Sequence, residues 1–340
     1  MAFQLIQDDV VREFRLYAPI GWPYWVAKAA AEGGRNGLPL VVALHGGGQD
    51  PEQFSDDWPF HTLINPTSST NWEDRFFVLY PHGFATTMLA DQPLRGWNTG
   101  FAGESIPVPN DVAFISKAVR TVENLLQREL QEIGLNKAPI DVDRRFLFGY
   151  SMGGMMAYKL AHELPDQFAA LWVMSSAIGG RAHDGRTPTV TNDAQGTHKL
   201  SLFAHHGDQD VVVPPGPGLD PTGTQINSIA HALYQAAGMP TTNADDYVGS
   251  VRNLNAAIEI YKLHNDCEPT AFSSSTTEAD IGGGTGSQQY VFRQAGGAPN
   301  PEVIVYRDPV LEHTGLTATG APRYFDQADV WEFFKSHPRV

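Results

Sequence analysis

A glycine-flanked serine follows a short apolar run near the middle of the chain. Residues 146–154 read Phe-Leu-Phe-Gly-Tyr-Ser-Met-Gly-Gly, so that Ser151 lies in a G-x-S-x-G sequence directly before the helix-forming stretch Met155–Leu164. A strand, a serine and a helix in this order form a tight turn that exposes the serine Oγ, provided that its neighbours are small. The pattern predicts Ser151 as a nucleophile that attacks a carbonyl carbon. The backbone N–H of Met152, at the start of the helix, would face the developing negative charge.

An acidic residue and a histidine follow Ser151 in the order that hydrolases with such a turn use. An apolar run over residues 200–204 leads into a turn that contains Asp208 and Asp210. We predict Asp210 as the acid, with Asp208 as the alternative, because aspartate also caps turns and Asp208 fits that role better. Of the 12 histidines, His313 combines the right order with a preceding apolar strand, and it is the predicted general base.

A glycine cluster near the N-terminus offers a second hydrogen-bond donor for the same chemistry. Residues 39–44 form a buried-strand run that ends in His45, followed by three glycines. Glycines let a backbone approach a tetrahedral intermediate closely, and a loop of this type donates an N–H to an oxyanion. We therefore expect Gly47 or Gly48 to complete an oxyanion hole with Met152. His45 is expected to hydrogen-bond the loop backbone.

Strands and helices alternate around these residues. Strands are expected at Val11–Ala18, Leu40–Leu44, Arg75–Tyr80, Arg145–Gly149, Ala169–Met174, Lys199–Ala204 and Glu302–Tyr306. Helices are expected from the capping residue Asn110 to near Gly134, directly after Ser151, and over Phe325–Ser336. Such alternation is typical of an α/β fold with a mainly parallel central sheet and helices on both faces.

No linker or internal repeat divides the chain, so we expect a single catalytic domain over residues 1–340. Loop insertions are expected near residues 84–109, 180–197 and 214–224, and a local β-hairpin or loop over 270–289. Loops at the carboxyl ends of parallel strands surround ligand sites. Trp97, in the first insertion, is therefore a candidate to line an acyl or aryl pocket. The alternative is that Trp97 packs the loop.

Charge and cysteine content narrow the range of partners and cofactors. The formal net charge of −15 would repel nucleic acid and anionic membranes, and it fits a neutral small-molecule or oligomeric substrate. Cys267 is the only cysteine, which leaves no internal disulfide and no cysteine-based zinc site. The predicted chemistry needs no metal or organic cofactor. The first ten residues lack the segments of a signal peptide, as expected of a cytoplasmic protein or of a secreted one whose leader has been removed.

Several stretches match the motifs of one enzyme family. The matching segments are residues 44–49 (compare L-H-G-C-x-Q), 97–98 (W-N), 110–115 (D-D-V-x-F-I), 142–158 around Ser151, 206–214 (H-G-x-x-D-x-x-V-P) and 313–314 (H-T). On these segments the chain resembles the polyhydroxybutyrate depolymerase and feruloyl esterase group of α/β-hydrolases. The resemblance runs from about residue 12 to 338, with strong motifs and weak tracts between them. The resemblance implies an α/β-hydrolase fold and a serine esterase that forms an acyl-enzyme, and it places the acid on Asp210.

The chain departs from this family in three segments. Gly47 and Gly96 stand where the family has cysteines, and the sequence Glu312-His313-Thr-Gly replaces G-H-T-W-P. Because the tryptophan after the histidine is missing, we expect small or oligomeric neutral esters as substrates (polyester-like, acetyl or feruloyl) in place of a solid polymer. Two alternatives remain: the same triad could cleave the carbon–carbon bond of a β-diketone, as in oxidised polyvinyl alcohol, or the chain could be a catalytically silent binding protein on this fold.

Overall fold

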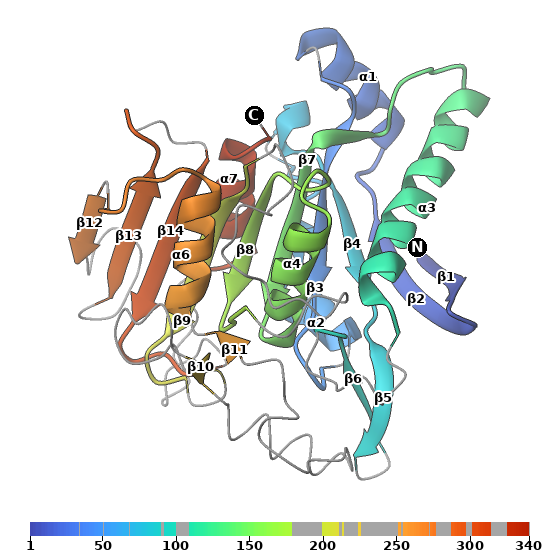
Figure 1. Cartoon of the computed structure of the whole chain (residues 1–340). Helices are drawn as coiled ribbons and strands as arrows, with labels where there is room; N and C mark the ends of the chain where they lie inside the picture. The colour runs from blue at the N-terminus through green and yellow to red at the C-terminus, as the bar shows by residue number, and fades with distance from the viewer. Residues whose placement is uncertain are drawn as a thin grey trace.

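The computed structural model describes most of the chain (Figure 1). The described residues are 1–33, 35–49, 51–67, 69–89, 92–99, 109–178, 199–210, 213, 224–225, 251–252, 254–271, 273–276, 287–296, 301–313 and 325–339. The insertions expected near 180–197 and 214–224 lie outside these residues, except for Thr224. Across the described ranges, no helix combines the length and the apolar character that crossing a membrane requires.

A ten-stranded sheet runs through the described part of the molecule, with the strand order β1-β2-β4-β3-β7-β8-β9-β14-β13-β12. In this order the strands are Ala2–Gln7, Val10–Tyr17, Phe77–Pro81, Leu38–Leu44, Ile140–Tyr150, Ala170–Met174, Ser201–Gly207, Glu302–Asp308, Gln288–Arg293 and Ser273–Thr276. The strands from β4 to β14 pair in parallel, and antiparallel strands flank them at both edges. The predicted, mainly parallel sheet is thus confirmed.

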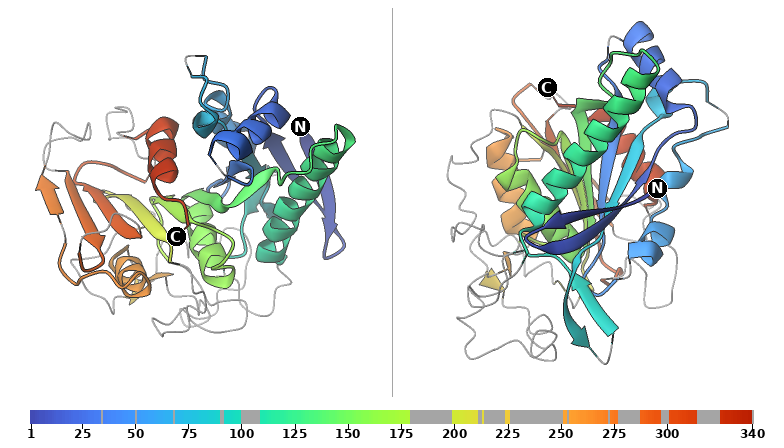
Figure 2. Two further views of the ribbon diagram at one scale, coloured as in Figure 1. Left: turned by 90° about the horizontal axis from the view of Figure 1, so that it is seen from above. Right: turned by 90° about the vertical axis from the view of Figure 1, so that its right-hand side faces the viewer.

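Helices cover both faces of the sheet (Figures 1 and 2). One face packs against α3 (Asp111–Glu132), α4 (Met152–Glu163) and α6 (Leu254–His264), with α1 (Trp22–Glu32) joining the same apolar cluster. The other face packs against α2 (Pro51–Asp57) and α7 (Gln327–Ser336). Short 3-10 helices lie at Phe60–Thr62 and Trp72–Asp74. Two small antiparallel pairs complete the described elements: the hairpin of β5 (Phe84–Leu89) with β6 (Gln92–Gly96), and β10 (Thr224–Gln225) with β11 (Val251–Arg252).

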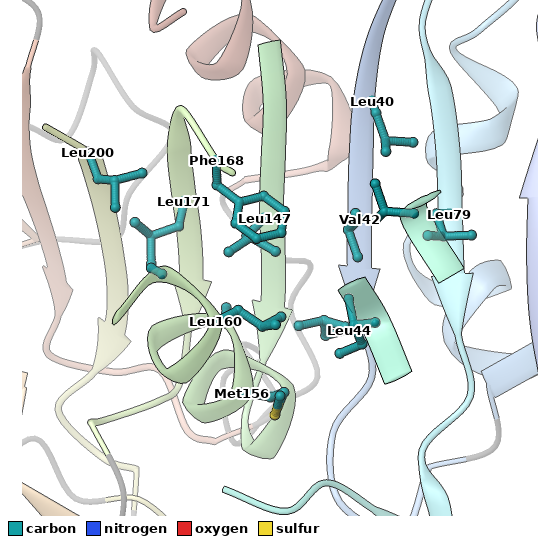
Figure 3. Packing of buried hydrophobic residues seen from close by; sticks show 14 of the residues in the cluster. Leu40, Val42, Leu44, Leu79, Leu147, Met156, Leu160, Phe168, Leu171 and Leu200 are labelled. Carbon is teal, nitrogen blue, oxygen red and sulfur yellow. The ribbon is translucent and has the colours of Figure 1, made fainter. Parts of the chain in front are cut away.

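The alternation of side chains along the central strands explains this two-sided packing. On β3, Leu40, Val42 and Leu44 face the cluster under α4, whereas Val41 and Ala43 belong to the cluster on the opposite face. Because a strand points successive side chains to opposite faces, a strand that is buried on both sides must be apolar throughout. Figure 3 shows the first cluster, in which Leu160 and Met156 of α4 lie against side chains from β3, β7 and β8.

The expected elements correspond closely to the observed ones. All seven expected strands are present within a few residues of their predicted bounds, and the Asn110 side chain caps α3 by accepting a hydrogen bond from the Ala113 N–H. The stretch 270–289 contributes to the antiparallel pair β12–β13. The sequence interpretation missed β1, α1, α2, α6 and the β5–β6 hairpin, which occupies part of the expected 84–109 insertion.

Candidate active site

Three predicted residues meet at the carboxyl ends of parallel strands β7, β9 and β14. Ser151 follows β7, Asp210 lies three residues after β9, and His313 lies in the loop after β14. His313 Nε2 is 2.8 Å from Ser151 Oγ, and His313 Nδ1 is 2.9 Å from Asp210 Oδ2. The structure thus joins the serine, the histidine and the carboxylate in a continuous hydrogen-bonded chain, although they are widely separated in sequence.

The backbone of Ser151 adopts a conformation that non-glycine residues rarely occupy. Its φ is 52° and its ψ is −121°, and it is the N-cap residue of α4. A Cβ at Gly149 would overlap the backbone of Gly153, and a Cβ at Gly153 would overlap the Leu44 carbonyl. The two flanking glycines are therefore required for close packing of the turn, and the half-buried Ser151 stores the strain that is typical of functional turns.

Asp210 is held as a buried carboxylate. It is 2% exposed, its Oδ1 accepts a hydrogen bond from the Val213 N–H at 2.7 Å, and its Oδ2 faces His313. The His206 Nε2 also lies 3.3 Å from Oδ2. Burial alone would raise the pKa of Asp210, but the hydrogen bonds from His206 and His313 outweigh it and lower the pKa to about 2. The carboxylate is thus kept charged opposite His313.

Asp208, the alternative acid, points to a different partner. Its Oδ1 pairs with the Arg307 guanidinium, with Arg307 Nε at 2.8 Å, and its backbone N–H donates to the Asp308 carbonyl. Both side chains of the pair are partly exposed. Asp208 is thus held in an ion pair with Arg307, and Asp210 is the carboxylate beside His313.

The loop that carries His313 is fixed by residues that the sequence interpretation did not single out. Asp308, at the end of β14, accepts hydrogen bonds from the backbone N–H groups of Val310 and Leu311 at 2.9 and 3.2 Å. The Tyr150 hydroxyl donates to the His313 backbone carbonyl at 3.0 Å. The sequence signal for Asp308 was the Asp-Pro pair at a strand end, which favours a turn. For Tyr150, only its position beside Ser151 could have drawn attention.

The hydrogen bonds of the backbone N–H groups near Ser151 distinguish between the donors expected for the oxyanion hole. The Met152 N–H is the first of α4, and the geometry of a helix gives it no intrahelical acceptor. The Gly48 N–H already donates to the Arg95 carbonyl at 2.7 Å, so Gly48 is not available as a donor. Gly47 packs directly against the Met152 side chain. Of the two glycines expected as the second donor, Gly47 thus remains, and its pairing with Met152 stays a prediction.

His45 has the backbone-binding role that was expected of it. Its Nε2 accepts a hydrogen bond from the Gly83 N–H at 2.9 Å, so its Nδ1 carries the proton and donates to the Gly46 carbonyl at 2.7 Å. The ring is fully buried. His45 thus connects the glycine loop, Gly46–Gly48, to the segment after β4.

Trp97 packs against His45, the residue directly before the glycine loop. Its side chain is 5% exposed, its indole N–H donates to the His45 carbonyl at 2.8 Å, and its ring lies 4.8 Å from the His45 ring. A side chain with these contacts supports the loop and offers little surface to a ligand. These contacts favour the alternative that Trp97 packs the loop over the expectation that it lines an acyl pocket.

The Met152 side chain fills the space between two glycine-containing segments. A Cβ at Gly47 would lie 3.1 Å from Met152 Cε, and a Cβ at Gly96 would lie 3.0 Å from Met152 Sδ. The Trp97 N–H also points at Met152 Sδ, at 3.4 Å. The thioether thus occupies the room that larger residues at positions 47 and 96 would need, and it connects α4 with both segments.

Comparison with known proteins places this geometry in a family. Residues 28–220 match the pattern of the Phospholipase/Carboxylesterase family. The "Bifunctional acetylxylan esterase/xylanase XynS20E" of Neocallimastix patriciarum is 24% identical over 52% of this chain and 20% of its own length. "Probable feruloyl esterase C" of Aspergillus clavatus is 27% identical over 53% of this chain and 58% of its own length. The chain thus spans less than two thirds of each of these curated relatives.

A solved structure supports the fold over nearly the whole chain. The acetyl xylan esterase from Aspergillus awamori superposes with a TM-score of 0.51 at 11% sequence identity, and the match covers 98% of both chains. At this identity the likeness concerns the fold alone. Together with the family pattern, which covers more than half of the residues, it shows that this chain belongs to the phospholipase/carboxylesterase family and has the α/β-hydrolase fold.

Proposed function

We propose that this chain is a serine hydrolase of carboxylic esters that works through an acyl-enzyme. The observation that carries the proposal is the hydrogen-bonded chain from Ser151 Oγ through His313 to Asp210, with distances of 2.8 and 2.9 Å. A nucleophile within reach of a base, and a base oriented by a third group, are the arrangement that covalent catalysis requires.

In the proposed reaction, Ser151 Oγ attacks the ester carbonyl carbon while His313 Nε2 takes the hydroxyl proton. The Met152 and Gly47 N–H groups donate to the oxyanion, each typically worth about 3–4 kcal/mol. The tetrahedral intermediate collapses when His313 protonates the leaving alcohol. Water, deprotonated by His313, then attacks the acyl-enzyme, and the carboxylic acid leaves as Ser151 regains its proton. Asp210 holds the tautomer of His313 and stabilises its charged form.

We further propose acetyl or feruloyl groups on neutral alcohols, carbohydrates included, as the substrate class. The names of the two curated relatives, an acetylxylan esterase/xylanase and a feruloyl esterase, support this choice. The net charge of −15 also favours neutral esters over anionic ones.

A hydrolysis screen with an active-site label tests the proposal. The screen compares p-nitrophenyl acetate, methyl ferulate, acetylated xylo-oligosaccharides, hydroxybutyrate oligomers and a β-diketone, each with the wild type and with Ser151→Ala. We expect ester cleavage and stoichiometric labelling by a fluorophosphonate with the wild type alone. Cleavage of the β-diketone without esterase activity would support the carbon–carbon hydrolase instead. A wild type that neither reacts with the label nor cleaves any ester would be a silent binding protein.

A further inference from the structure

A second histidine lies against the acid of the triad. His206 is in β9, and its side chain and that of Asp210 have no exposed surface. Its Nε2 lies 2.7 Å from the Val213 carbonyl and 3.3 Å from Asp210 Oδ2. Its Nδ1 is buried and has no hydrogen-bond partner among the described residues. The family comparison and the proposed reaction assign no role to this residue.

The surroundings of the ring show which nitrogen acts as the donor. Nε2 faces two acceptors, a carbonyl and a carboxylate oxygen, so Nε2 must carry a proton. The Nε2–H of His206 is therefore shared between the Val213 carbonyl and the Asp210 carboxylate.

This shared N–H closes a ring of contacts around the Asp210 carboxylate. The shorter contact fixes the Val213 carbonyl, and the Val213 N–H in turn donates to Asp210 Oδ1 at 2.7 Å. The longer contact acts on Oδ2 directly, on the oxygen that also faces His313 Nδ1. A carboxylate torsion is otherwise broad and has weak rotamer preferences. His206 thus restrains both oxygens, one through Val213 and the other directly.

We propose that His206 is a positioning residue for the triad: its Nε2–H holds the Asp210 carboxylate in the orientation that keeps Oδ2 opposite His313. The inference rests on the proposed function, because it concerns the same catalytic group. The direction of the Asp210 pKa is consistent with it, since hydrogen bonding by His206 favours the charged carboxylate.

Two amide substitutions test the effect of the Nε2–H donor independently of the imidazole ring. In His206→Gln the amide nitrogen is the same number of bonds from Cα as Nε2, so it can reach both acceptors. In His206→Asn the amide nitrogen corresponds to Nδ1, for which the described part of the chain offers no hydrogen-bond partner. His206→Leu removes both nitrogens and keeps an apolar side chain. We expect His206→Gln to keep kcat within about threefold of wild type. The other two variants should lose about 10- to 100-fold in kcat with little change in KM, as for the loss of one hydrogen bond to a charged group.

Two controls make the result specific. In an Asp210→Asn background, His206→Leu should cause no further loss of kcat, because the proposed route runs through Asp210. The NMR resonance of the His313 Nδ1 proton should move in His206→Asn and stay near its wild-type position in His206→Gln. Thermal unfolding of each variant identifies any that fail to fold, and the Gln–Asn pair decides the matter if His206→Leu does not fold.

Three results would overturn the inference: His206→Gln as damaged as His206→Asn, wild-type kcat in a folded His206→Asn, or a further loss of kcat on top of Asp210→Asn. These outcomes differ from failure of the proposed function, which would show as activity retained by Ser151→Ala or as a wild type without activity. If the wild type has no activity, the His313 Nδ1 proton resonance of the His206 variants still tests whether His206 positions the Asp210 carboxylate.

Discussion

The Tyr150 hydroxyl donates a hydrogen bond to the backbone carbonyl of His313 at 3.0 Å, although 163 positions separate the two residues in sequence. Tyr150 ends β7 and directly precedes Ser151, whereas His313 lies in the loop after β14. A single side chain thus ties the turn that carries the serine to the loop that carries the histidine. The relative position of Ser151 and His313 depends on this contact as well as on the sheet.

Removing the Tyr150 hydroxyl should therefore leave the position of His313 relative to Ser151 less well fixed. We expect Tyr150→Phe to lower kcat several-fold at nearly constant KM, and to lower the free energy of unfolding by about 1 kcal/mol, the typical value of one hydrogen bond. Steady-state kinetics and urea unfolding measure the two effects. Tyr158→Phe in α4 is the matched control, because the buried Tyr158 hydroxyl has no hydrogen-bond partner within the described ranges, and the substitution should change neither quantity much. Equal effects of the two substitutions would contradict the role of Tyr150.

The strained backbone of Ser151 predicts a difference between two inactive variants. Both Ser151→Ala and Ser151→Gly should abolish turnover, since neither has a nucleophile. Because φ is 52° at this position, alanine keeps the strain, whereas glycine adopts such a conformation freely. We expect Ser151→Gly to be more stable than Ser151→Ala by about 1 kcal/mol, measured by urea unfolding. Equal stability would show that the turn is unstrained.

The two aspartates after β9 should differ sharply. Asp210→Asn should lower kcat by about 10,000-fold, because an amide opposite His313 Nδ1 favours the wrong tautomer. Asp208→Asn breaks a partly exposed ion pair with Arg307, and such pairs contribute about 0–1 kcal/mol. Its kcat should remain near wild type. Steady-state kinetics on the best ester would show the opposite ranking if Asp208 were the acid.

The lowered pKa of Asp210 predicts how its contribution to stability varies with pH. Its value in the folded protein, about 2, is below the ordinary 3.8, so the folded state binds fewer protons than the unfolded state in this range. The stabilisation is complete above about pH 4 and is lost as the pH falls towards 2. The difference in free energy of unfolding between wild type and Asp210→Asn should therefore narrow by about 1 kcal/mol between pH 6 and pH 3. Urea unfolding at stepwise pH measures this, and a constant difference would refute it.

The contacts of Trp97 predict that its substitution affects small and bulky substrates alike. A pocket residue would affect bulky acyl groups more than acetyl. A residue that holds the His45 carbonyl should affect both alike, because it acts on the glycine loop. We expect Trp97→Phe, which removes the indole N–H and part of the ring, to lower kcat for p-nitrophenyl acetate and for methyl ferulate by similar factors. It should also destabilise the fold by about 1–3 kcal/mol, seen in thermal unfolding. A selective rise in KM for the ferulate would restore the pocket interpretation.

The sequence carries strong local signals for the buried centre of the sheet and weak ones for its edges. Strands such as β3 are continuous apolar runs, and α3 has both a capping asparagine and apolar residues at helical spacing, so both could be predicted. Strand β1 alternates polar and apolar residues, and its pairing with β2 depends on the turn at Asp8 and Asp9, both with positive φ. Helix α1 follows Gly21 and has a proline in its first turn, a start signal that its aromatic and alanine-rich sequence obscured.

The meeting of Ser151, His313 and Asp210 could be predicted because their order along the chain follows from the fold. Each of them comes within five residues after a strand, and parallel strands end at one edge of the sheet. What the sequence could not predict is which side chains meet there from distant segments. The partner of Tyr150, the donor shared by His206 and the direction of Trp97 all depend on tertiary packing. The choice between Gly47 and Gly48 likewise depended on the Arg95 carbonyl, which occupies the Gly48 N–H.

The Met152 thioether between Gly47 and Gly96 makes the shape of the glycine loop independent of thiol oxidation. In the family that the chain resembles, these two positions hold cysteines. Here Cys267 is the only cysteine of the 340 residues, and it lies far from the loop in sequence. Dithiothreitol and other thiol reductants therefore have no bond to break near the serine. Oxygen addition to Met152 would instead enlarge a side chain that both glycine segments already contact closely. The loop thus gains tolerance of reducing conditions and becomes sensitive to peroxide.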